Sequence, residues 1–351
     1  MFSRKDMNIR DLTIDELNDV INSYGEKPYR ARQIFEWLHK HMIFDLSDAS
    51  NLSKDLISKL KSDFELGMPS IEKEYVSKID ETKKFLIKLH DGSLIEAVLM
   101  KYKYGYSLCI SSEVGCNMGC KFCASTIGGL KRNLEAYEML SEVYLISKHN
   151  DIRVSNIVIM GIGEPLQNFD NVIKFLMLIS SKLGQNISLR NITLSTCGIV
   201  ENIYILAKLN MPITLALSLH APNQKIREKL MPIAKKYDLK DVMEAMASYF
   251  ETTNRRITFE YSLVKGVNSD RECALELVRL FEDSFKDRHV DFNVNLISVN
   301  KIDERDYIPP EEKDINAFKD ILDHAGINTL IRRKLGKDIS GSCGQLRMSV
   351  K

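Results

Sequence analysis

The sequence has few of the features that mark disordered, secreted or membrane-spanning chains. Only 8 of its 351 residues are proline and 17 are glycine, while 44% are hydrophobic, which excludes an intrinsically disordered chain. No apolar run approaches the roughly 18 residues of a membrane span, and the charged start MFSRKDMNIRD lacks the apolar core of a secretory signal. We therefore expect a cytoplasmic protein with no membrane partner.

An excess of charge of one sign is also missing. The 49 Lys and Arg residues face 48 Asp and Glu residues, a formal net charge of +1, so no overall basic field indicates a nucleic-acid partner. A local basic surface is still compatible with this balance. In a cytoplasmic protein the 7 cysteines are expected to be reduced thiols, available for metal binding or catalysis.

Hydrophobic periodicity predicts a small helical domain over residues 1–70. Apolar residues recur at three- and four-residue spacing in three segments: 12–24, 29–42 and 53–64. Thr13 and Glu16 have the spacing of a capping box at the start of the first segment. After this domain, residues 71–104 are predicted to form a connecting β-hairpin, because two strand-like runs meet at Asp91-Gly92.

From residue 105 onward, strand-like runs alternate with helical stretches. The six runs are 106–111, 156–160, 191–195, 213–218, 256–264 and 290–297. Such alternation is typical of a parallel α/β sheet or an open barrel, and we assign residues 105–335 to a core of this kind. Residues 336–351 are predicted to form a C-terminal tail.

Three cysteines follow the first of these strands. Cys116, Cys120 and Cys123 have the spacing C-x3-C-x2-C, on a loop expected at the carboxyl edge of the sheet, where α/β proteins place their active sites. Three thiolates on one loop can hold three irons of a four-iron cluster and leave the fourth iron open for a substrate. The alternatives are a structural zinc site, for which no partnering His or Cys stands nearby, and simple packed thiols.

Small polar groups follow the later strands. Gly163 and Glu164 lie in Gly161-Ile-Gly-Glu164-Pro165, where glycines allow close backbone approach and the carboxylate can accept a hydrogen bond. Other candidates at strand ends are Ser195, Ser218, Leu219, His220 and Asn300. For each alone, a tight turn or strand-terminal capping is the more ordinary explanation, but together they indicate a ligand pocket beside the cysteines.

Two further thiols have ordinary explanations when taken alone. Cys109 lies on the first core strand and is typical of a buried apolar thiol, while Cys343 lies in the tail between glycine-containing segments. The glycines suit a flexible loop that can bring the Cys343 thiol into a pocket.

Taken together, the motifs resemble the radical S-adenosylmethionine (SAM) RNA methyltransferases that modify carbon 2 of adenine, the RlmN family, with the carbon-8 enzyme Cfr as a relative. The resemblance rests on the cysteine loop and four other segments: 25–35, Gly161-Ile-Gly-Glu-Pro-Leu166, Ser218-Leu-His-Ala-Pro-Asn223 and Cys343-Gly-Gln-Leu346. It implies an open (β/α)6 partial barrel with a small N-terminal helical domain and a short β-hairpin. One departure is Glu113, where the family usually has Gln.

The resemblance also implies a mechanism and a set of site residues. Cys116, Cys120 and Cys123 would hold a [4Fe-4S] cluster; Gly163, Glu164, Ser195, Ser218, Leu219, His220 and Asn300 would bind SAM. Two SAM molecules serve each turnover: one methylates Cys343, and the second yields the radical that activates this methyl group for attack on carbon 2. Glu96 would accept the carbon-2 proton, and Cys109 would release the product by forming a disulfide with Cys343.

The implied partners are 23S ribosomal RNA, transfer RNA as a second substrate, and a flavodoxin-type electron donor; we expect a monomer. Candidates for RNA contact are Tyr29, Arg30, Arg32, Gln33, Trp37, Arg332, Arg333, Lys334 and Lys337. Two other functions stay open on the sequence alone. One is the same chemistry at carbon 8, and the other is a non-catalytic, zinc-stabilised RNA-binding protein.

Overall fold

The computed structural model describes residues 4–347, so the first three residues of the predicted helical domain and the last four of the predicted tail lie outside it. The N-terminal helices are α1 (Ile14–Ser23), α2 (Tyr29–Phe35), a π-helical turn η3 (Glu36–Lys40) and α3 (Lys54–Asp63). The predicted capping box is confirmed: Glu16 N donates to Thr13 Oγ1 at 3.2 Å, and Thr13 N donates to Glu16 Oε2 at 2.7 Å.

The core is built around one ten-stranded sheet in the order β1-β2-β3-β4-β7-β8-β9-β10-β11-β12. Its strands are β1 (Ser70–Val76), β2 (Lys83–Lys88), β3 (Leu94–Tyr102), β4 (Gly105–Ile110), β7 (Val154–Ile159), β8 (Ile192–Thr196), β9 (Thr214–Ser218), β10 (Ile257–Leu263), β11 (Phe292–Ser298) and β12 (Thr329–Ile331). From β4 to β12 all neighbours pair in parallel, which confirms the six predicted core strands; β12 lies at the end of this parallel series. All carboxyl ends of these strands therefore meet at one rim.

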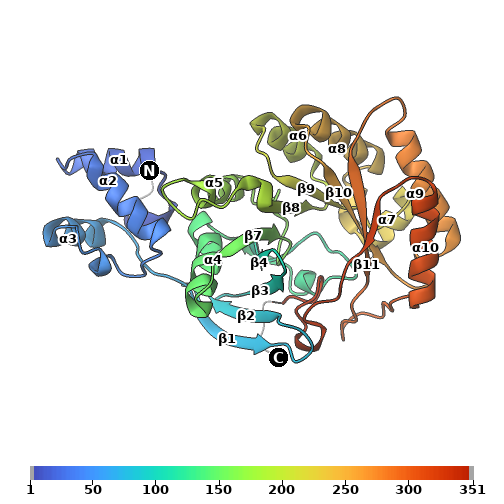
Figure 1. The fold of residues 1–351 in the computed structure, drawn as a ribbon, viewed down its shortest axis with the longest axis horizontal. Coiled ribbons are helices and arrows are strands. Elements are labelled where there is room, and N and C mark those ends of the chain that lie inside the picture. Colours follow the sequence, from blue (N-terminus) through green and yellow to red (C-terminus); the bar gives the residue numbers. More distant parts are fainter. Residues whose placement is uncertain (1–3, 348–351) are drawn as a thin grey trace.

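Helices connect the parallel strands and cover the outer side of the curved sheet (Figure 1). They are α4 (Ala136–Asn150), α5 (Phe169–Ser180), α6 (Val200–Leu209), α7 (Gln224–Leu230), α8 (Leu239–Thr253), α9 (Arg271–Ser284) and α10 (Glu312–His324). None of the helices in residues 4–347 is both long and apolar enough to cross a membrane. The result is the open, partial barrel that the resemblance implies.

The hairpin region differs from the expectation in two ways. A third strand, β1, precedes the predicted pair, and β3 pairs antiparallel with β4, so that this region continues the main sheet. Strand β1 gave no strand pattern in the sequence because it lies at the sheet edge and most of its side chains are exposed or half-buried. A small separate pair, β5 (Glu113–Gly115) with β6 (Leu130–Asn133), brackets the cysteine loop and was also not predicted. The domain limits at 70, 104 and 335 stay a prediction.

The helical domain is joined to the core through buried polar contacts. His39 is fully buried, and its Nδ1 lies 2.9 Å from the hydroxyl of Tyr144 on α4. Asp11 accepts a hydrogen bond from Tyr137 N at the start of α4, at 2.7 Å, and Gln185 donates to the carbonyl of His39 at 2.8 Å. Because these groups are removed from water, each needs its partner across the junction.

We predict that Tyr144→Phe lowers the free energy of unfolding by about 1–3 kcal/mol, because it leaves the buried His39 ring without its partner. Urea unfolding of the purified protein measures this change. Tyr204→Phe on α6 is the matched control, since Tyr204 is only half-buried. Equal stability of the Tyr144 variant and the wild type would show that this contact does not hold the helical domain to the core.

Candidate functional site

A cavity opens at the carboxyl rim of the parallel strands, and segments distant in the sequence line it. Its wall includes the cysteine loop, the ends of β7 to β11 and the tail. The predicted residues that line it are Cys116, Cys120, Cys123, Gly163, Glu164, Ser195, Ser218, His220, Asn300 and Cys343. The structure thus brings together ten of the thirteen predicted site residues; Leu219, Cys109 and Glu96 lie outside this cavity.

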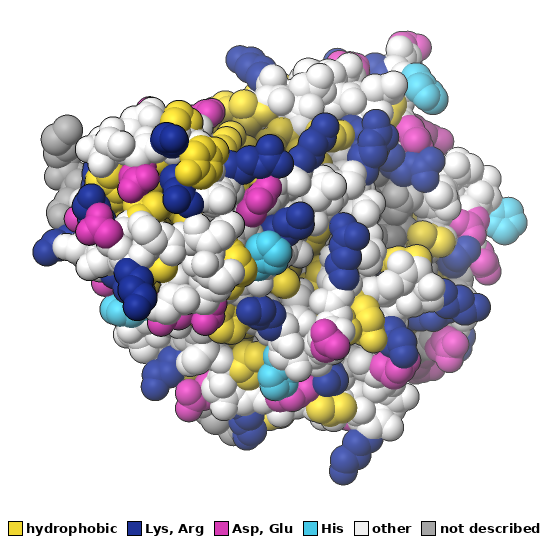
Figure 2. All heavy atoms as spheres, turned by 60° about the vertical axis from the view of Figure 1, so that its left-hand side comes forward, with side chains coloured by type: hydrophobic (Ala, Val, Ile, Leu, Met, Phe, Trp, Pro, Cys, Tyr) yellow, Lys and Arg dark blue, Asp and Glu magenta, His cyan; other side chains and the backbone are white. Residues whose placement is uncertain are grey.

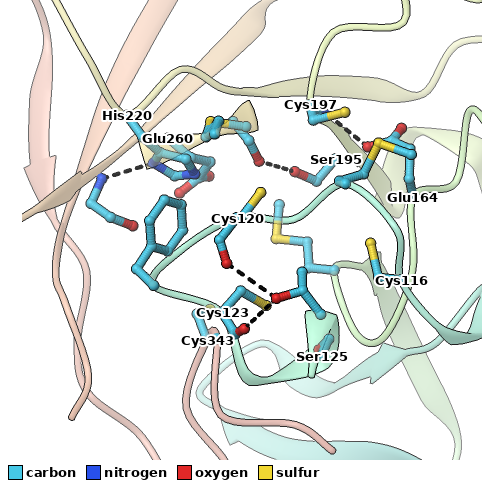
Figure 3. Close-up of a pocket in the computed structure, with 18 of the residues that line it drawn as sticks. Cys116, Cys120, Cys123, Ser125, Glu164, Ser195, Cys197, His220, Glu260 and Cys343 are labelled. Atoms are coloured by element: carbon cyan, nitrogen blue, oxygen red, sulfur yellow. Dashed lines mark hydrogen bonds between the residues drawn. The ribbon is translucent and has the colours of Figure 1, made fainter. Parts of the chain in front are cut away.

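The three loop cysteines surround one side of this space (Figure 3). A side chain of the loop holds its backbone in place: Thr126 Oγ1 donates to the carbonyls of Cys120 and Cys123 at 3.2 and 2.9 Å. Burial raises the pKa of Cys120 to about 12, and it also raises the pKa of Cys116 and of Cys123. In the absence of a cation these thiols stay protonated at neutral pH, and metal binding must release their protons.

The donor set fits a cluster better than a single ion. Within residues 4–347, no three Cys, His, Asp or Glu side chains converge closely enough to hold one metal ion. In a four-iron cluster each thiolate binds a different iron, so the sulfurs surround the group and need not meet at a point. Cys116 lies in a buried apolar cluster with Met118, Leu230 and Met231, and soft thiolates are the ligands that iron–sulfur clusters use.

The Gly161–Pro165 turn approaches the cysteine loop so closely that only glycine fits. Gly163 has φ +115°, and a Cβ atom there would lie 2.7 Å from the Cβ of Glu113. Glu164 is buried, and its carboxylate accepts hydrogen bonds from Cys197 N at 2.7 Å and Leu166 N at 3.1 Å. The carboxylate therefore has a structural role in the turn, and it also faces the cavity (Figure 3).

The polar groups at the later strand ends are positioned by local contacts. Ser195 Oγ and Ser218 Oγ lie 3.3 Å apart. His220 Nδ1 accepts a hydrogen bond from Ser262 N at 2.9 Å, and burial lowers the pKa of this ring to about 3, so it is neutral. Asn300 Nδ2 donates to the carbonyl of Cys343 at 3.0 Å. Leu219 has its side chain fully buried in the core, so only its backbone is available for the role that the resemblance implies.

Glu113 is fully buried behind the turn. Its Oε2 accepts a hydrogen bond from Glu164 N at 2.9 Å, and its Oε1 has no partner. Burial raises the pKa of Glu113 to about 8, so at neutral pH the carboxyl keeps its proton. A protonated glutamate and a glutamine both offer an uncharged side chain whose oxygen can accept the Glu164 N–H.

The tail is docked onto the cysteine loop and carries Cys343 to the cavity. Ala124 N donates to the carbonyl of Gly344 at 2.8 Å, and Ser125 Oγ donates to the carbonyl of Leu346 at 3.0 Å. The Cys343 side chain lies beside Cys123 in Figure 3. These two contacts join segments that are more than two hundred residues apart in the sequence.

A second, smaller cavity brings Cys343 and Cys109 together. Both thiols line it, with Met160, Arg332 and Leu346 among the other lining residues. Cys109 is 9% exposed and Cys343 is exposed, and both are free thiols. Burial raises the pKa of Cys109, and the neighbouring Cys343 adds to this increase.

Glu96 is buried at the back of the tail and is not a solvated carboxylate. Lys84 Nζ lies 2.9 Å from Glu96 Oε1, and Arg347 N donates to Glu96 Oε2 at 2.8 Å. The carboxylate is therefore occupied by an ion pair and by the tail backbone. It lines neither the main cavity nor the one shared by Cys109 and Cys343.

Three residues with charged or thiol side chains line the cavity but were not predicted as site residues. Glu260 accepts from Asn295 Nδ2 at 2.8 Å and lies 3.3 Å from Arg332 Nη1. Arg332, a candidate RNA contact, also lines the cavity, and its pKa is raised, with Cys343 as the main cause. Cys197 is the third of these residues. A glutamate inside the fully buried strand β10 was the available sequence signal for Glu260.

Some candidate RNA contacts of the helical domain already form contacts within that domain. Arg30 lies over the Tyr29 ring at 5.0 Å and donates to the Asn51 carbonyl at 2.9 Å, while Trp37 Nε1 donates to Asn51 Oδ1 at 2.7 Å. Tyr29 is 51% exposed. Figure 2 shows Lys and Arg side chains spread over this side of the molecule, with acidic side chains between them.

We predict that Glu113→Gln stabilises the protein relative to wild type increasingly as pH rises from about 5 to 8. The folded pKa of Glu113 is raised above its ordinary value of 4.5, so ionisation in this range favours the unfolded wild type and leaves the glutamine variant unaffected. Thermal unfolding of both cluster-free proteins across this pH range measures the difference. A difference that does not change with pH would contradict a neutral Glu113.

Comparisons with known proteins agree on one family. Residues 110–278 match the model of the radical SAM superfamily, and residues 7–66 match that of the ribosomal RNA large subunit methyltransferase N-terminal domain. The chain is 51% identical over 340 residues to a probable dual-specificity RNA methyltransferase RlmN from Clostridium novyi, covering 97% of both chains. It is 53% identical over 343 residues to the protein of the same name from Lachnoclostridium phytofermentans, covering 98% of this chain and 95% of that protein.

The fold agrees as well. A radical SAM methyltransferase from Sphaerobacter thermophilus superposes with a TM-score of 0.92 at 37% identity, covering 98% of this chain and all of that one. The fold is thus shared over nearly the full length of both chains. The chain belongs to the RlmN family of radical SAM RNA methyltransferases.

Proposed function

We propose that this enzyme methylates carbon 2 of adenine in 23S ribosomal RNA and in transfer RNA, through a methyl group carried by Cys343. The observation that supports this most is the single cavity at the strand ends, which Cys116, Cys120, Cys123 and Cys343 all line. Carbon 2 lies between two ring nitrogens and has no lone pair to attack a sulfonium methyl group, so polar methyl transfer to it is excluded. A tail thiol beside a radical-generating site provides another route.

Cys116, Cys120 and Cys123 would each bind one iron of a [4Fe-4S] cluster. When bound, the cluster supplies an electron that cleaves SAM to a 5′-deoxyadenosyl radical, and we expect a flavodoxin-type protein to be the donor. Gly163, Glu164, Ser195, Ser218, His220 and Asn300 line the space in which SAM would bind, and Leu219 would contribute its backbone.

Cys343 and Cys109 would have different roles in the reaction. Cys343 would take a methyl group from a first SAM, and a second SAM would activate it, so that two SAM molecules are used per turnover. After the methylene group has bonded to carbon 2, Cys109 would attack the Cys343 sulfur. The S–S bond then forms as the bond between the Cys343 sulfur and the methylene carbon breaks, and that carbon takes up a proton to become the methyl group of the product. The cavity that Cys109 and Cys343 share supports this pairing.

Glu96 would accept the carbon-2 proton. Its present partners, Lys84 and the backbone N–H of Arg347, keep the carboxylate in place behind the tail. To accept a proton from the base, Glu96 would have to give up its contact with Arg347, because the carboxylate lines neither cavity. We expect the enzyme to act as a monomer in the cytoplasm. RNA would be guided to the site by Tyr29, Arg30 and the basic residues Arg333, Lys334 and Lys337.

Product analysis separates the proposal from its rival at carbon 8. Modified RNA is digested to nucleosides, and the methyladenosine isomers are resolved by chromatography and mass spectrometry. We expect 2-methyladenosine from both ribosomal and transfer RNA substrates. An 8-methyladenosine product would overturn the assigned position, and an unmodified RNA from a protein with a full cluster would overturn the activity.

We predict that Cys109→Ala traps a covalent bond between Cys343 and the RNA, because no second thiol remains to break it. Denaturing gel electrophoresis with labelled RNA detects the adduct as a slowly migrating band. Cys273→Ala is the matched control, since Cys273 is also a buried thiol but lies on α9 and lines neither cavity. Methylated RNA released freely by the Cys109 variant would contradict the resolving role.

A further inference from the structure

An arginine with unusual surroundings lies under the cysteine loop. Arg227 belongs to α7, and its side chain is 0% exposed. Its Nη2 donates to the carbonyl of Cys197 at 2.6 Å and lies 3.5 Å from the carbonyl of Ser218. Its Nε and Nη1 have no hydrogen-bond partner. A guanidinium has five N–H donors, so most of its capacity is unused.

Helix α7 and the residues after it form the floor of the loop. Lys121 N donates to the carbonyl of Leu230, the last residue of α7, at 2.8 Å. A Cβ atom at Gly119 would lie 3.3 Å from Pro232. The packing around this contact is apolar, with Cys116, Met118, Cys197, Leu230 and Met231 in one buried cluster. The Arg227 charge therefore acts through a medium in which screening by water is weak.

This cation has no anion to balance it. No carboxylate of residues 4–347 forms an ion pair with Arg227. Burial lowers the pKa of its guanidinium, and the neighbouring thiols of Cys197 and Cys120 oppose this shift. A buried charge without a partner destabilises a folded protein. A guanidinium stays protonated even so, because its ordinary pKa is very high. The site is thus built to receive negative charge on the side of Cys120.

We propose that Arg227 is the fixed counter-charge of the cluster site, a positioning residue that balances the negative charge of three thiolates bound to iron and stabilises the one-electron-reduced form most. This inference rests on the proposed function, because it needs a cluster at Cys116, Cys120 and Cys123. Reduction adds one electron from a one-electron reductant such as dithionite, and no bond is formed or broken. Arg227 then raises the reduction potential of the cluster.

The test compares two variants that differ in charge. Arg227→Gln keeps a donor for the Cys197 carbonyl but is neutral, while Arg227→Lys keeps the positive charge. Each protein is reconstituted with iron and sulfide under anaerobic conditions and titrated with dithionite, and electron paramagnetic resonance follows the reduced cluster. We expect a more negative midpoint potential for the glutamine variant and a clearly smaller shift for the lysine variant. Equal potentials for wild type and Arg227→Gln would overturn the proposal.

Thermal unfolding supplies a readout that needs no turnover. Without a cluster, the Arg227→Gln variant should melt at the same temperature as wild type or higher, because it lacks the unbalanced buried charge. Cluster binding should then raise the melting temperature of the variant by less than it raises that of wild type. A purely structural arginine would instead lower both melting temperatures equally, and that result would reject the counter-charge. If the glutamine variant fails to fold, Arg227→Met undergoes the same measurements.

Arg10 is the matched control, because it is also an almost fully buried arginine. It lies in the helical domain, where Nη1 and Nη2 donate to the carbonyls of Leu66 and Ile43 at 3.0 and 2.9 Å. Arg10→Gln should lower both melting temperatures and leave the potential unchanged; a shifted potential would reject the proposal.

Failure of the wild type to assemble any cluster would refute the proposed function itself, whereas a normal cluster with an unaltered Arg227→Gln potential refutes this inference alone.

Discussion

The docking of the tail onto the cysteine loop is the interaction on which the site depends. Two hydrogen bonds, from Ala124 N to Gly344 and from Ser125 Oγ to Leu346, hold residues 344–346 against the loop. A third, from Asn300 to the Cys343 carbonyl, fixes the tail to the end of β11. Without these contacts the exposed Cys343 thiol would have no fixed position relative to the three loop cysteines.

The fold supplies the rim that makes this docking useful. Because β4 and β7 to β12 run parallel, the loop after each strand emerges at the same edge, and the cavity is lined by residues from β7 to β11 without any long excursion of the chain. Buried apolar strands give the rim its rigidity, which a site needs if reacting groups are to be held at fixed distances. The reacting groups thus lie on loops, and the sheet fixes the distances between them.

The sequence predicts the architecture and the cysteine loop well, but it does not predict the residues that surround them through tertiary contacts. The period of the apolar residues identifies all six core strands, and the spacing of Cys116, Cys120 and Cys123 identifies the loop, because both are local patterns. Glu260, Arg332 and Arg227 reach the site through tertiary packing, so no local pattern marks their contacts. Strand β1 was missed because its edge position leaves its side chains half-exposed. The Lys84 partner of Glu96 likewise depends on the pairing of β2 with β3.

Mass spectrometry of Cys343 tests the central claim most directly. The protein is isolated from cells that supply SAM, digested, and the peptides that contain Cys343 and Cys109 are weighed. The account predicts one additional methyl group on Cys343 and none on Cys109, since only the tail thiol carries the group that is transferred. An unmodified Cys343 in protein with a complete cluster, or a methyl group on another cysteine, would contradict it.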